Sequence, residues 1–178
     1  MEPEKYTKII RKRRIRLADR EGWKSVGMRL LTVLVILGIL FSTVFFLTRI
    51  SGNAMMPAVH DGDVLLGYRL EGNYSKGDIV QYQKDGKTYI GRIAAAGMET
   101  VNITEEGQVL VDGNVEDGDI LFKTEPGTVL TYPYQVPAGS FFILGDYRTA
   151  AQDSRTLGPV SQKDIDGKII TLFRRRNL

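Results

Sequence analysis

Few residues in this chain are able to do covalent chemistry. The sequence contains no cysteine, which excludes thiol catalysis and cysteine-ligated metals. It contains one histidine, His60, in a turn-like stretch where an exposed loop histidine is the expected interpretation. A single histidine without a second nitrogen or thiol ligand does not make a zinc site. The hydroxyl groups of serine and the amines of lysine remain to be considered.

The segment from Ser51 to Pro57 reads Ser-Gly-Asn-Ala-Met-Met-Pro and follows an uncharged apolar run. It resembles the nucleophile motif of type I signal peptidases, Ser-Gly-x-Ser-Met-x-Pro, except that the nucleophilic serine is Ala54. A methyl group cannot attack a carbonyl. The resemblance implies a peptide cleft, with ordinary core packing as the alternative for the apolar members. The candidate cleft residues are Ser51, Gly52, Asn53, Met55, Met56 and Pro57.

Three further blocks follow in the order found in that family, so the resemblance extends from about residue 50 to residue 173. The second block contains the Gly-Asp turns of residues 61–64 and 76–80. The third, residues 89–97, resembles Tyr-x-Lys-Arg-Val-x-Gly. The fourth, residues 145–160, resembles Gly-Asp-Asn-Arg-x-x-Ser-x-Asp-Ser-Arg-x-Gly-Pro-Val with one added residue. Four ordered blocks are far more specific than any one Gly-Asp turn.

The resemblance implies a serine–lysine dyad, in which burial keeps the lysine neutral so that it accepts the serine proton. The position of the lysine is Gly91, and the position of the second serine that orients it is Ala151. Together with Ala54, these residues leave the nucleophile, the base and the orienting group without their side chains. A single Ser→Ala change made in a laboratory would not explain three losses. The sequence therefore predicts no intact catalytic residues and a chain that is not an enzyme.

Two neighbouring residues are candidates to replace the dyad. Ser51 precedes Ala54 by three residues, which is about 10 Å in an extended chain. Lys87 precedes Gly91 by four residues and lies on the same face of a strand, but its amine would have to fold back along that strand. Neither is predicted to restore the chemistry.

Five charged residues match positions of the family outside the dyad. We predict that they form arginine–carboxylate pairs that hold the fourth block against the core, because the guanidinium group matches a carboxylate in two hydrogen bonds. Direct contact with a substrate is the alternative. These structural positions are Arg92, Asp146, Arg148, Asp153 and Arg155. No metal and no cofactor are predicted.

The elements that would position these residues begin with a membrane anchor. Residues 1–29 hold ten Lys and Arg against four acidic residues, whereas the rest of the chain is net negative. Residues 30–48 carry no charge and are long enough to cross the hydrocarbon core as a helix. The positive-inside rule predicts a cytoplasmic tail at 1–29, a transmembrane helix at 30–48 and an extracellular domain at 50–178. A cleaved signal peptide is the alternative, and nucleic acid is not a predicted partner.

The outer domain is predicted to be mainly β, because short runs rich in β-branched and aromatic residues alternate with Gly and Asp turns. Two hairpins are expected, through Asp85-Gly86 and through residues 105–107, with a surface loop at 112–128. The fold class is a signal-peptidase-like antiparallel β-barrel or coiled sheet behind one transmembrane helix. The expected strands are residues 64–70, 78–83, 87–93, 101–104, 108–111, 129–136, 140–144 and 168–173.

The missing side chains at three family positions lead to a functional hypothesis. The chain most resembles the signal-peptidase-like accessory proteins of Gram-positive pilus assembly, which also lack the serine and lysine. This implies a single-pass membrane protein that acts as a chaperone or docking factor for pilin subunits or a sortase. One alternative is a signal peptidase I, active or inactivated by engineering, that cleaves signal peptides from secreted preproteins. A second is a partner that presents substrates to an active peptidase.

Overall fold

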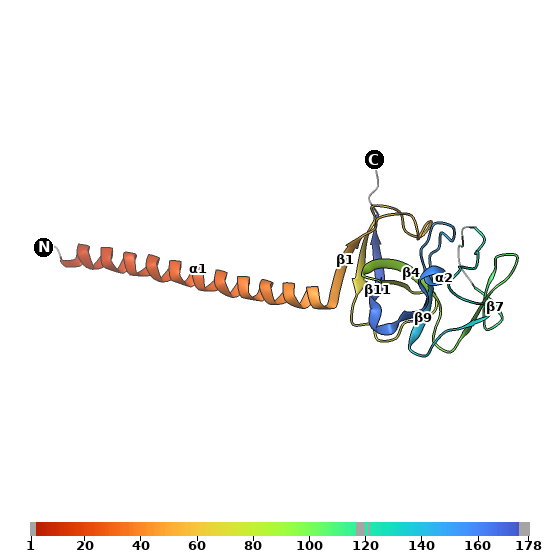
Figure 1. The fold of residues 1–178 in the computed structure, drawn as a ribbon. Coiled ribbons are helices and arrows are strands. Elements are labelled where there is room, and N and C mark those ends of the chain that lie inside the picture. Colours follow the sequence, from red (N-terminus) through yellow and green to blue (C-terminus); the bar gives the residue numbers. More distant parts are fainter. Residues whose placement is uncertain (1–2, 117–119, 121, 175–178) are drawn as a thin grey trace. The chain divides into compact units, whose positions relative to one another are not determined.

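The computed structural model describes residues 3–116, 120 and 122–174, with side chains from residue 22 onward. The chain divides into two compact units, Met1–Thr43 and Val44–Leu178. The first consists of the helix α1, which spans Pro3–Val44 and is drawn in red to orange in Figure 1. Its segment Gly22–Val44 has a mean hydropathy of 2.1, and none of it is buried, so by length and composition it is able to cross a membrane.

The prediction of a helix through residue 48 is wrong in its last four residues. The helix ends at Val44, and Phe45–Arg49 form the strand β1. β1 pairs with β2, and the side chain of Phe46 occupies the space over Gly67, where a Cβ atom would lie 2.1 Å from the Phe46 ring. Because apolar residues suit both a lipid-facing helix and a buried strand, composition alone did not reveal this boundary.

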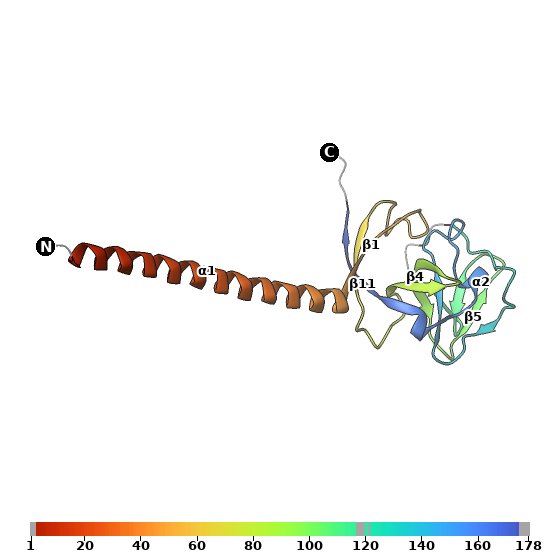
Figure 2. The same ribbon diagram turned by 60° about the vertical axis from the view of Figure 1, so that its left-hand side comes forward.

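The second unit is built from antiparallel strands, which confirms the predicted mainly β class (Figures 1 and 2). One sheet has seven strands in the order β1-β2-β11-β3-β4-β9-β10, and the other has four in the order β7-β6-β5-β8. Neither sheet closes on itself among the described residues, which agrees with the coiled-sheet form of the predicted class. The strands are β1 Phe45–Arg49, β2 Val64–Tyr68, β3 Ile79–Lys84, β4 Lys87–Ala95, β5 Thr100–Ile103, β6 Val109–Val111, β7 Asn114–Val115, β8 Tyr134–Gln135, β9 Ser140–Leu144, β10 Val160–Ser161 and β11 Ile165–Phe173.

Both predicted hairpins are present. β3 and β4 are joined through Asp85 and Gly86, whose φ angles of 49° and 72° suit the tight turns that connect twisted strands. β5 and β6 form the second hairpin. The strand expected at 129–136 is reduced to β8, and the loop expected at 112–128 contains β7. Residues 117–119 and 121 of that loop lie outside the described residues.

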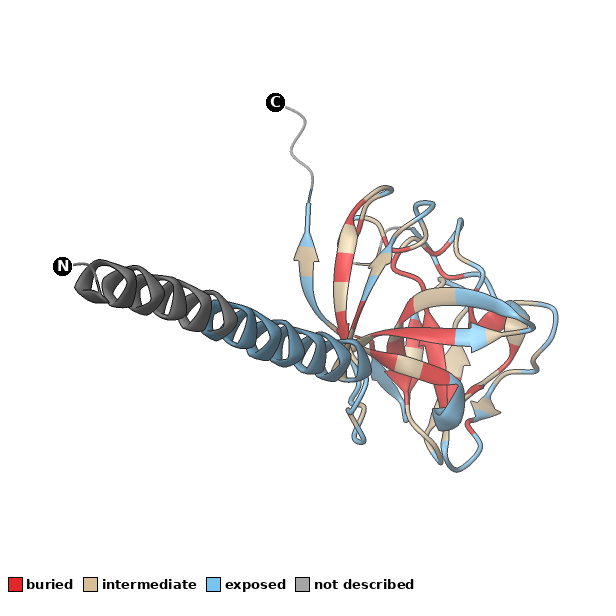
Figure 3. Cartoon of the chain, turned by 90° about the vertical axis from the view of Figure 1, so that its left-hand side faces the viewer, coloured by how far each residue is buried: buried red, intermediate tan, exposed pale blue. Residues whose placement is uncertain are grey.

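The core of this unit forms three clusters of buried apolar residues, and Figure 3 shows burial concentrated in its strands. The first involves strands of both sheets, because residues of β4 and β9 pack against residues of β5 and β6. The second joins β3, β4, β9 and β11 within the larger sheet. The third joins β2 to Met55 and Val59, and so holds the segment after β1 in place. Two short helical turns complete the unit: α2, Ser154–Leu157, and the 3₁₀ turn Gln162–Asp164.

Candidate peptide cleft

A cleft of about 420 Å³ lies between the segment after β1 and the beginning of β4. Its walls come from three stretches far apart in the sequence: residues 48–55, residues 88–90, and Ala150 with Gln152. Main-chain hydrogen bonds from Ile50 N to Asp63 O (2.9 Å) and from Gly62 N to Ile50 O (3.0 Å) fix the first wall. The lining residues are Thr48, Arg49, Ile50, Ser51, Gly52, Asn53, Ala54, Met55, Thr88, Tyr89, Ile90, Ala150 and Gln152.

One wall of the cleft is a strand with an open edge. β4 pairs with β3 along Lys87–Arg92, but β9 pairs only with its second half, from Arg92 to Ala95. Thr88–Ile90 therefore have no strand neighbour on the side opposite β3 within the described structure. An extended peptide is able to pair with such an edge through its main chain.

The structure divides the candidate cleft residues into two groups. Ser51, Gly52, Asn53 and Met55 line the cleft, whereas Met56 and Pro57 do not. The side chain of Met55 is also part of the core, since it is 3% exposed and belongs to the third buried cluster. For Met55 the cleft role and the packing alternative are therefore both realised.

The three positions that lack family side chains converge around the end of β9. A Cβ atom built on Gly145 would lie 2.2 Å from Ala151 Cβ and 2.7 Å from Ala54 O. A Cβ atom on Gly91 would lie 3.1 Å from Leu144 O, the residue before Gly145. The fold thus brings together positions 54, 91 and 151, which the sequence separates by up to 97 residues.

The surroundings of Gly91 leave no space for a side chain. It lies buried in β4, opposite Val80 of β3. A Cβ atom there would lie 2.5 Å from Ile143 Cγ2, closer than carbon atoms approach. A larger side chain at this position would require β9 or Ile143 to shift.

The described family arginines have structural partners. Arg92 Nε and Nη2 donate to the two carboxylate oxygens of Asp146, at 2.9 and 2.6 Å, and Nη1 donates to Gly77 O at 2.9 Å. The two-pronged pair joins β4 to the start of the fourth block. The carbonyl of Gly77 adds the turn before β3 to the same guanidinium.

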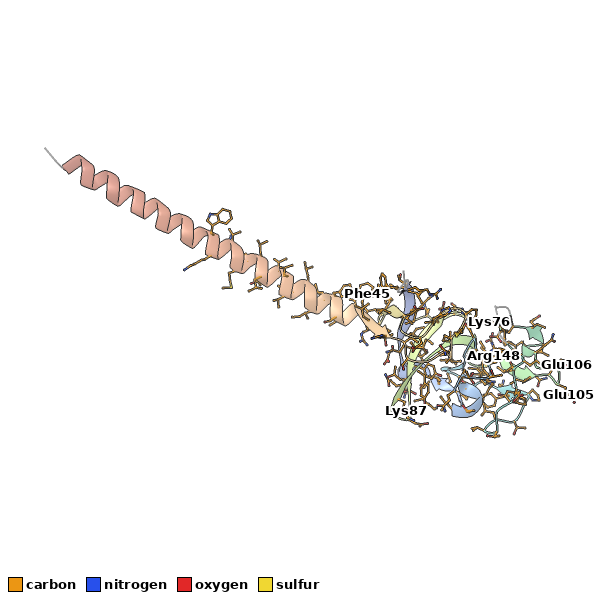
Figure 4. All side chains as sticks on the ribbon, turned by 90° about the horizontal axis from the view of Figure 1, so that it is seen from above. Phe45, Lys76, Lys87, Glu105, Glu106 and Arg148 are labelled. Atoms are coloured by element: carbon orange, nitrogen blue, oxygen red, sulfur yellow. The ribbon has the colours of Figure 1, made fainter. Side chains whose placement is uncertain are left out.

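Arg148, labelled in Figure 4, has a side chain that is 1% exposed. Its guanidinium donates to Gly145 O at 3.0 Å, to Thr124 Oγ1 at 2.8 Å and to Glu116 Oε2 at 2.8 Å. One buried cation thereby holds the fourth block and two points of the long loop after β7. Such a group costs a great deal to bury without partners, and here it is satisfied.

Asp153 and Arg155 form the second buried pair of this block. Arg155 Nε and Nη2 each donate to one oxygen of Asp153 at 2.8 Å, and Nη2 also donates to Arg148 O at 2.6 Å. Asp153 also accepts from Gly145 N at 3.1 Å and caps α2 by accepting from Arg155 N. These contacts occupy both partners, and neither lines the cleft.

The other candidate residues lie apart from the cleft. Lys87, labelled in Figure 4, is exposed at the start of β4 and opposite Lys84, and it is not among the lining residues. His60 is partly buried, and its main-chain N donates to Asp63 Oδ2 at 3.0 Å. No group of three metal-ligating side chains occurs among the described residues.

Burial raises the pKa of four tyrosines, Tyr74, Tyr82, Tyr132 and Tyr134, none of which lines the cleft. Desolvation raises the pKa of Tyr82, whose ring stacks on Tyr89 with centroids 5.6 Å apart. Desolvation, with a smaller contribution from the Asp153 carboxylate, raises the pKa of Tyr132 to about 12. The hydroxyl groups of Tyr82 and Tyr132 lack a hydrogen-bond partner among the described residues. These shifts are properties of the core and supply no acid or base to the cleft.

Sequence reasoning missed eight of the thirteen residues that line the cleft. The positions it did not identify are Thr48, Arg49, Ile50, Thr88, Tyr89, Ile90, Ala150 and Gln152. Tyr89 and Ile90 belong to the third block and Thr88 precedes it. The open edge of β4 that brings these residues to the cleft is set by tertiary pairing and has no signature in the sequence.

The family model described as "Signal peptidase, peptidase S26" matches residues 23–173. A signal peptidase I of Bacillus licheniformis is 29% identical over 161 residues, which cover 83% of this chain and 84% of that protein. The mitochondrial ATP-independent inner membrane protease subunit 1b of Arabidopsis thaliana is 29% identical over 160 residues, covering 86% and 83%. A crystal structure of a signal peptidase I from Enterococcus faecalis V583 has a TM-score of 0.46 at 24% identity, covering 56% of this chain and 97% of that one.

These comparisons contradict the prediction that the chain is not an enzyme, because the family model and the named relatives describe peptidases. The prediction depended on the side chains at positions 54, 91 and 151 alone. Three positions do not determine the chemistry of a cleft that also contains the hydroxyl groups of Thr48, Ser51 and Thr88. The apolar helix and the peptidase relatives together indicate a single-pass association with a membrane.

Proposed function

The chain belongs to the signal peptidase family, peptidase S26, and from this premise we propose that it acts as a signal peptidase I on the signal-peptide region of secreted preproteins. The observation that carries the proposal is the open edge of β4 at Thr88–Ile90, which faces a cleft of about 420 Å³. An extended preprotein segment would add to this edge as a strand, and main-chain hydrogen bonds would bind it without regard to most of its sequence.

The walls of the cleft suit a segment with small side chains. Gly52, Ala54 and Ala150 contribute little bulk, and Ile50 and Ile90 contribute apolar surface. Small residues in the bound segment would let its main chain approach the β4 edge closely. This supports recognition of the small-x-small pattern that marks a signal-peptide cleavage site.

The charge of the N-terminal segment supports an orientation for this activity. Residues 1–29 are strongly basic and precede the apolar part of α1, so the positive-inside rule puts them in the cytoplasm and the β unit outside.

Cleavage in this cleft would require a hydroxyl group from a residue other than Ala54. The hydroxyl side chains that line it are Thr48, Ser51, Thr88 and Tyr89, and no lysine or histidine is among the lining residues. A reaction with any of these nucleophiles would need its proton transferred to a group outside the described lining, to the peptide or to water.

Purified full-length protein in detergent micelles, incubated with a preprotein, tests the proposal. The readouts are binding, by fluorescence anisotropy of a labelled segment spanning the cleavage site, and cleavage, by mass spectrometry. Binding followed by a cut after the small-x-small site supports a signal peptidase. Absence of binding, or binding that no cut follows, overturns the proposal.

A docking role in sortase-dependent pilus assembly is the second candidate. It is supported by the close packing at Gly91, where Ile143 Cγ2 occupies the place of a side chain, together with Ala54 and Ala151. In this role the same cleft would hold an extended segment of a pilin subunit or of a sortase. Pilin segments that bind more tightly than preprotein segments would favour it, and normal pili in cells that lack the protein would rule it out.

A further inference from the structure

One charged side chain stands out among the residues that line the cleft. Of the thirteen lining residues, Arg49 alone carries a formal charge; the others are apolar or neutral polar. The net charge of the cleft wall is therefore positive, although the chain after residue 29 is net negative. A carboxylate entering the cleft would meet this guanidinium and no competing anion of the lining.

Arg49 differs from the three arginines at family positions in its partners. Arg92, Arg148 and Arg155 each bind a carboxylate. Among the described residues, no carboxylate lies within ion-pair distance of Arg49. Asp61, which lines a neighbouring hollow together with Arg49, accepts a hydrogen bond from Gly52 N at 2.8 Å.

The main chain fixes the position of Arg49 in the cleft wall. It is the last residue of β1 and pairs with Val64 of β2. The next residue is fixed on both sides by its main-chain bonds to Gly62 and Asp63. The side chain of Arg49 is exposed, and its Nη2 atom lies 3.8 Å from where a Cβ atom of Gly62 would be. The attachment point is thus rigid while the guanidinium is open to a ligand.

We propose that Arg49 is a specificity-determining residue that selects peptide segments carrying a carboxylate near the bound strand. This inference rests on the proposed function, since it names the chemistry of the segment that the cleft takes. A guanidinium binds a carboxylate with two parallel hydrogen bonds, and a neutral or basic side chain at the same place offers none. Because Arg49 is exposed, an effect of about two- to fivefold in Kd is expected, which is the range of a solvent-accessible ion pair.

The test uses full-length protein in detergent micelles and labelled peptides that span a preprotein cleavage site. At each position in turn, the peptides carry Glu, Gln or Lys, and anisotropy gives the Kd of each. The variants are Arg49→Gln and Arg49→Glu. The matched control is Lys76→Gln, which removes an exposed positive charge in the turn before β3. Lys76, labelled in Figure 4, is not among the lining residues.

The expected result is a preference of the natural chain for Glu over Gln at one or two neighbouring positions. Arg49→Gln should abolish the preference, Arg49→Glu should reverse it toward Lys, and Lys76→Gln should leave it intact. The preference should weaken as salt concentration rises. Equal binding of all three peptides by the natural chain would overturn the assignment of Arg49 and leave the proposed function standing. No binding of any peptide would instead overturn the proposed function.

Discussion

The fourth block and the cleft wall lie within a few ångströms of each other around Gly145, yet they use polar groups in opposite ways. In the fourth block, the guanidinium groups of Arg148 and Arg155 are buried and bound to carboxylates and carbonyls. In the cleft, Ala54 offers only a methyl group, and the polar side chains of its neighbours are exposed.

The two regions differ in which of their polar groups are available to bind a peptide selectively. Polar groups that are already saturated by structural partners cannot bind a ligand without losing those partners. The fourth block is therefore a scaffold, and recognition in the cleft must come from the open edge of β4 and from exposed groups such as Arg49 and Ser51. Substitutions should separate the two regions, with stability affected in the scaffold and binding affected in the cleft.

The largest effect on stability is expected for Arg155→Met. It leaves the Asp153 carboxylate, whose side chain is 2% exposed, without its cation and breaks the bond to Arg148 O. Removing one partner of a buried pair costs about 3–5 kcal/mol in the free energy of unfolding. Urea unfolding followed by circular dichroism in micelles measures this, with Lys163→Met, at an exposed position, as the control. A loss under about 1 kcal/mol would show that the block is not the scaffold.

Gly145→Ala tests the place where the two regions meet. Its Cβ atom would lie 2.2 Å from Ala151 Cβ and 2.7 Å from Ala54 O, so both neighbours must move. Overpacking of this kind costs about 1–3 kcal/mol, and peptide affinity should fall with stability. Gly72→Ala, which meets no atom within 4 Å, is the control. Full affinity in a destabilised Gly145→Ala variant would show that the cleft is independent of the block.

Gly91→Ala should cost somewhat less, about 1–2 kcal/mol. The methyl group of Ile143 would lie 2.5 Å from the added Cβ atom, so it must move to make room. Ile143→Ala removes this methyl group, so in a double-mutant cycle the second change should partly relieve the first. If the losses in the free energy of unfolding are additive, Ile143 is not what fills the space at Gly91. The Leu144 carbonyl oxygen, 3.1 Å from the added Cβ atom, would then be the obstacle.

The smallest effect at neutral pH is expected for Tyr132→Phe, because the hydroxyl group it removes has no hydrogen-bond partner among the described residues. Burial raises the pKa of Tyr132 to about 12 from 10.0, so the folded state favours the neutral phenol. Its contribution to stability is present below pH 10 and is lost as the pH rises to 12. The variant should lose stability less steeply than the natural chain over that range. The free energy of unfolding is measured with urea at each pH. If it falls equally steeply with pH in the variant and in the natural chain, the Tyr132 hydroxyl group is not buried as described.

Local patterns predicted much of the fold. The hairpin of β3 and β4 follows from alternating residues around Asp85-Gly86, and the apolar helix follows from its length and lack of charge. The end of that helix could not be predicted, because Phe45 and Phe46 are equally suited to lipid and to the space over Gly67. The pairing partner decides between them, and it lies some twenty residues further along the chain.

The site was predictable to the extent that its residues are contiguous. Ser51 to Asn53 were identified from one motif, whereas Arg49, Thr88 and Gln152 come to the cleft only through the fold. The inference from Ala54, Gly91 and Ala151 to a chain that is not an enzyme was contradicted by the family comparisons. Side chains absent at three positions say little about the other groups that the fold places nearby.

The central claim is that an extended peptide binds between Ser51–Asn53 and the open edge of β4. The chain has no cysteine, so a single cysteine at Thr88 or Asn53 provides a unique site for cross-linking to a preprotein segment that carries a thiol-reactive group. We predict efficient cross-linking from Thr88→Cys and Asn53→Cys, competed by unlabelled segment, and none from the exposed control Lys163→Cys. Equal, uncompeted labelling of all three positions would contradict the account.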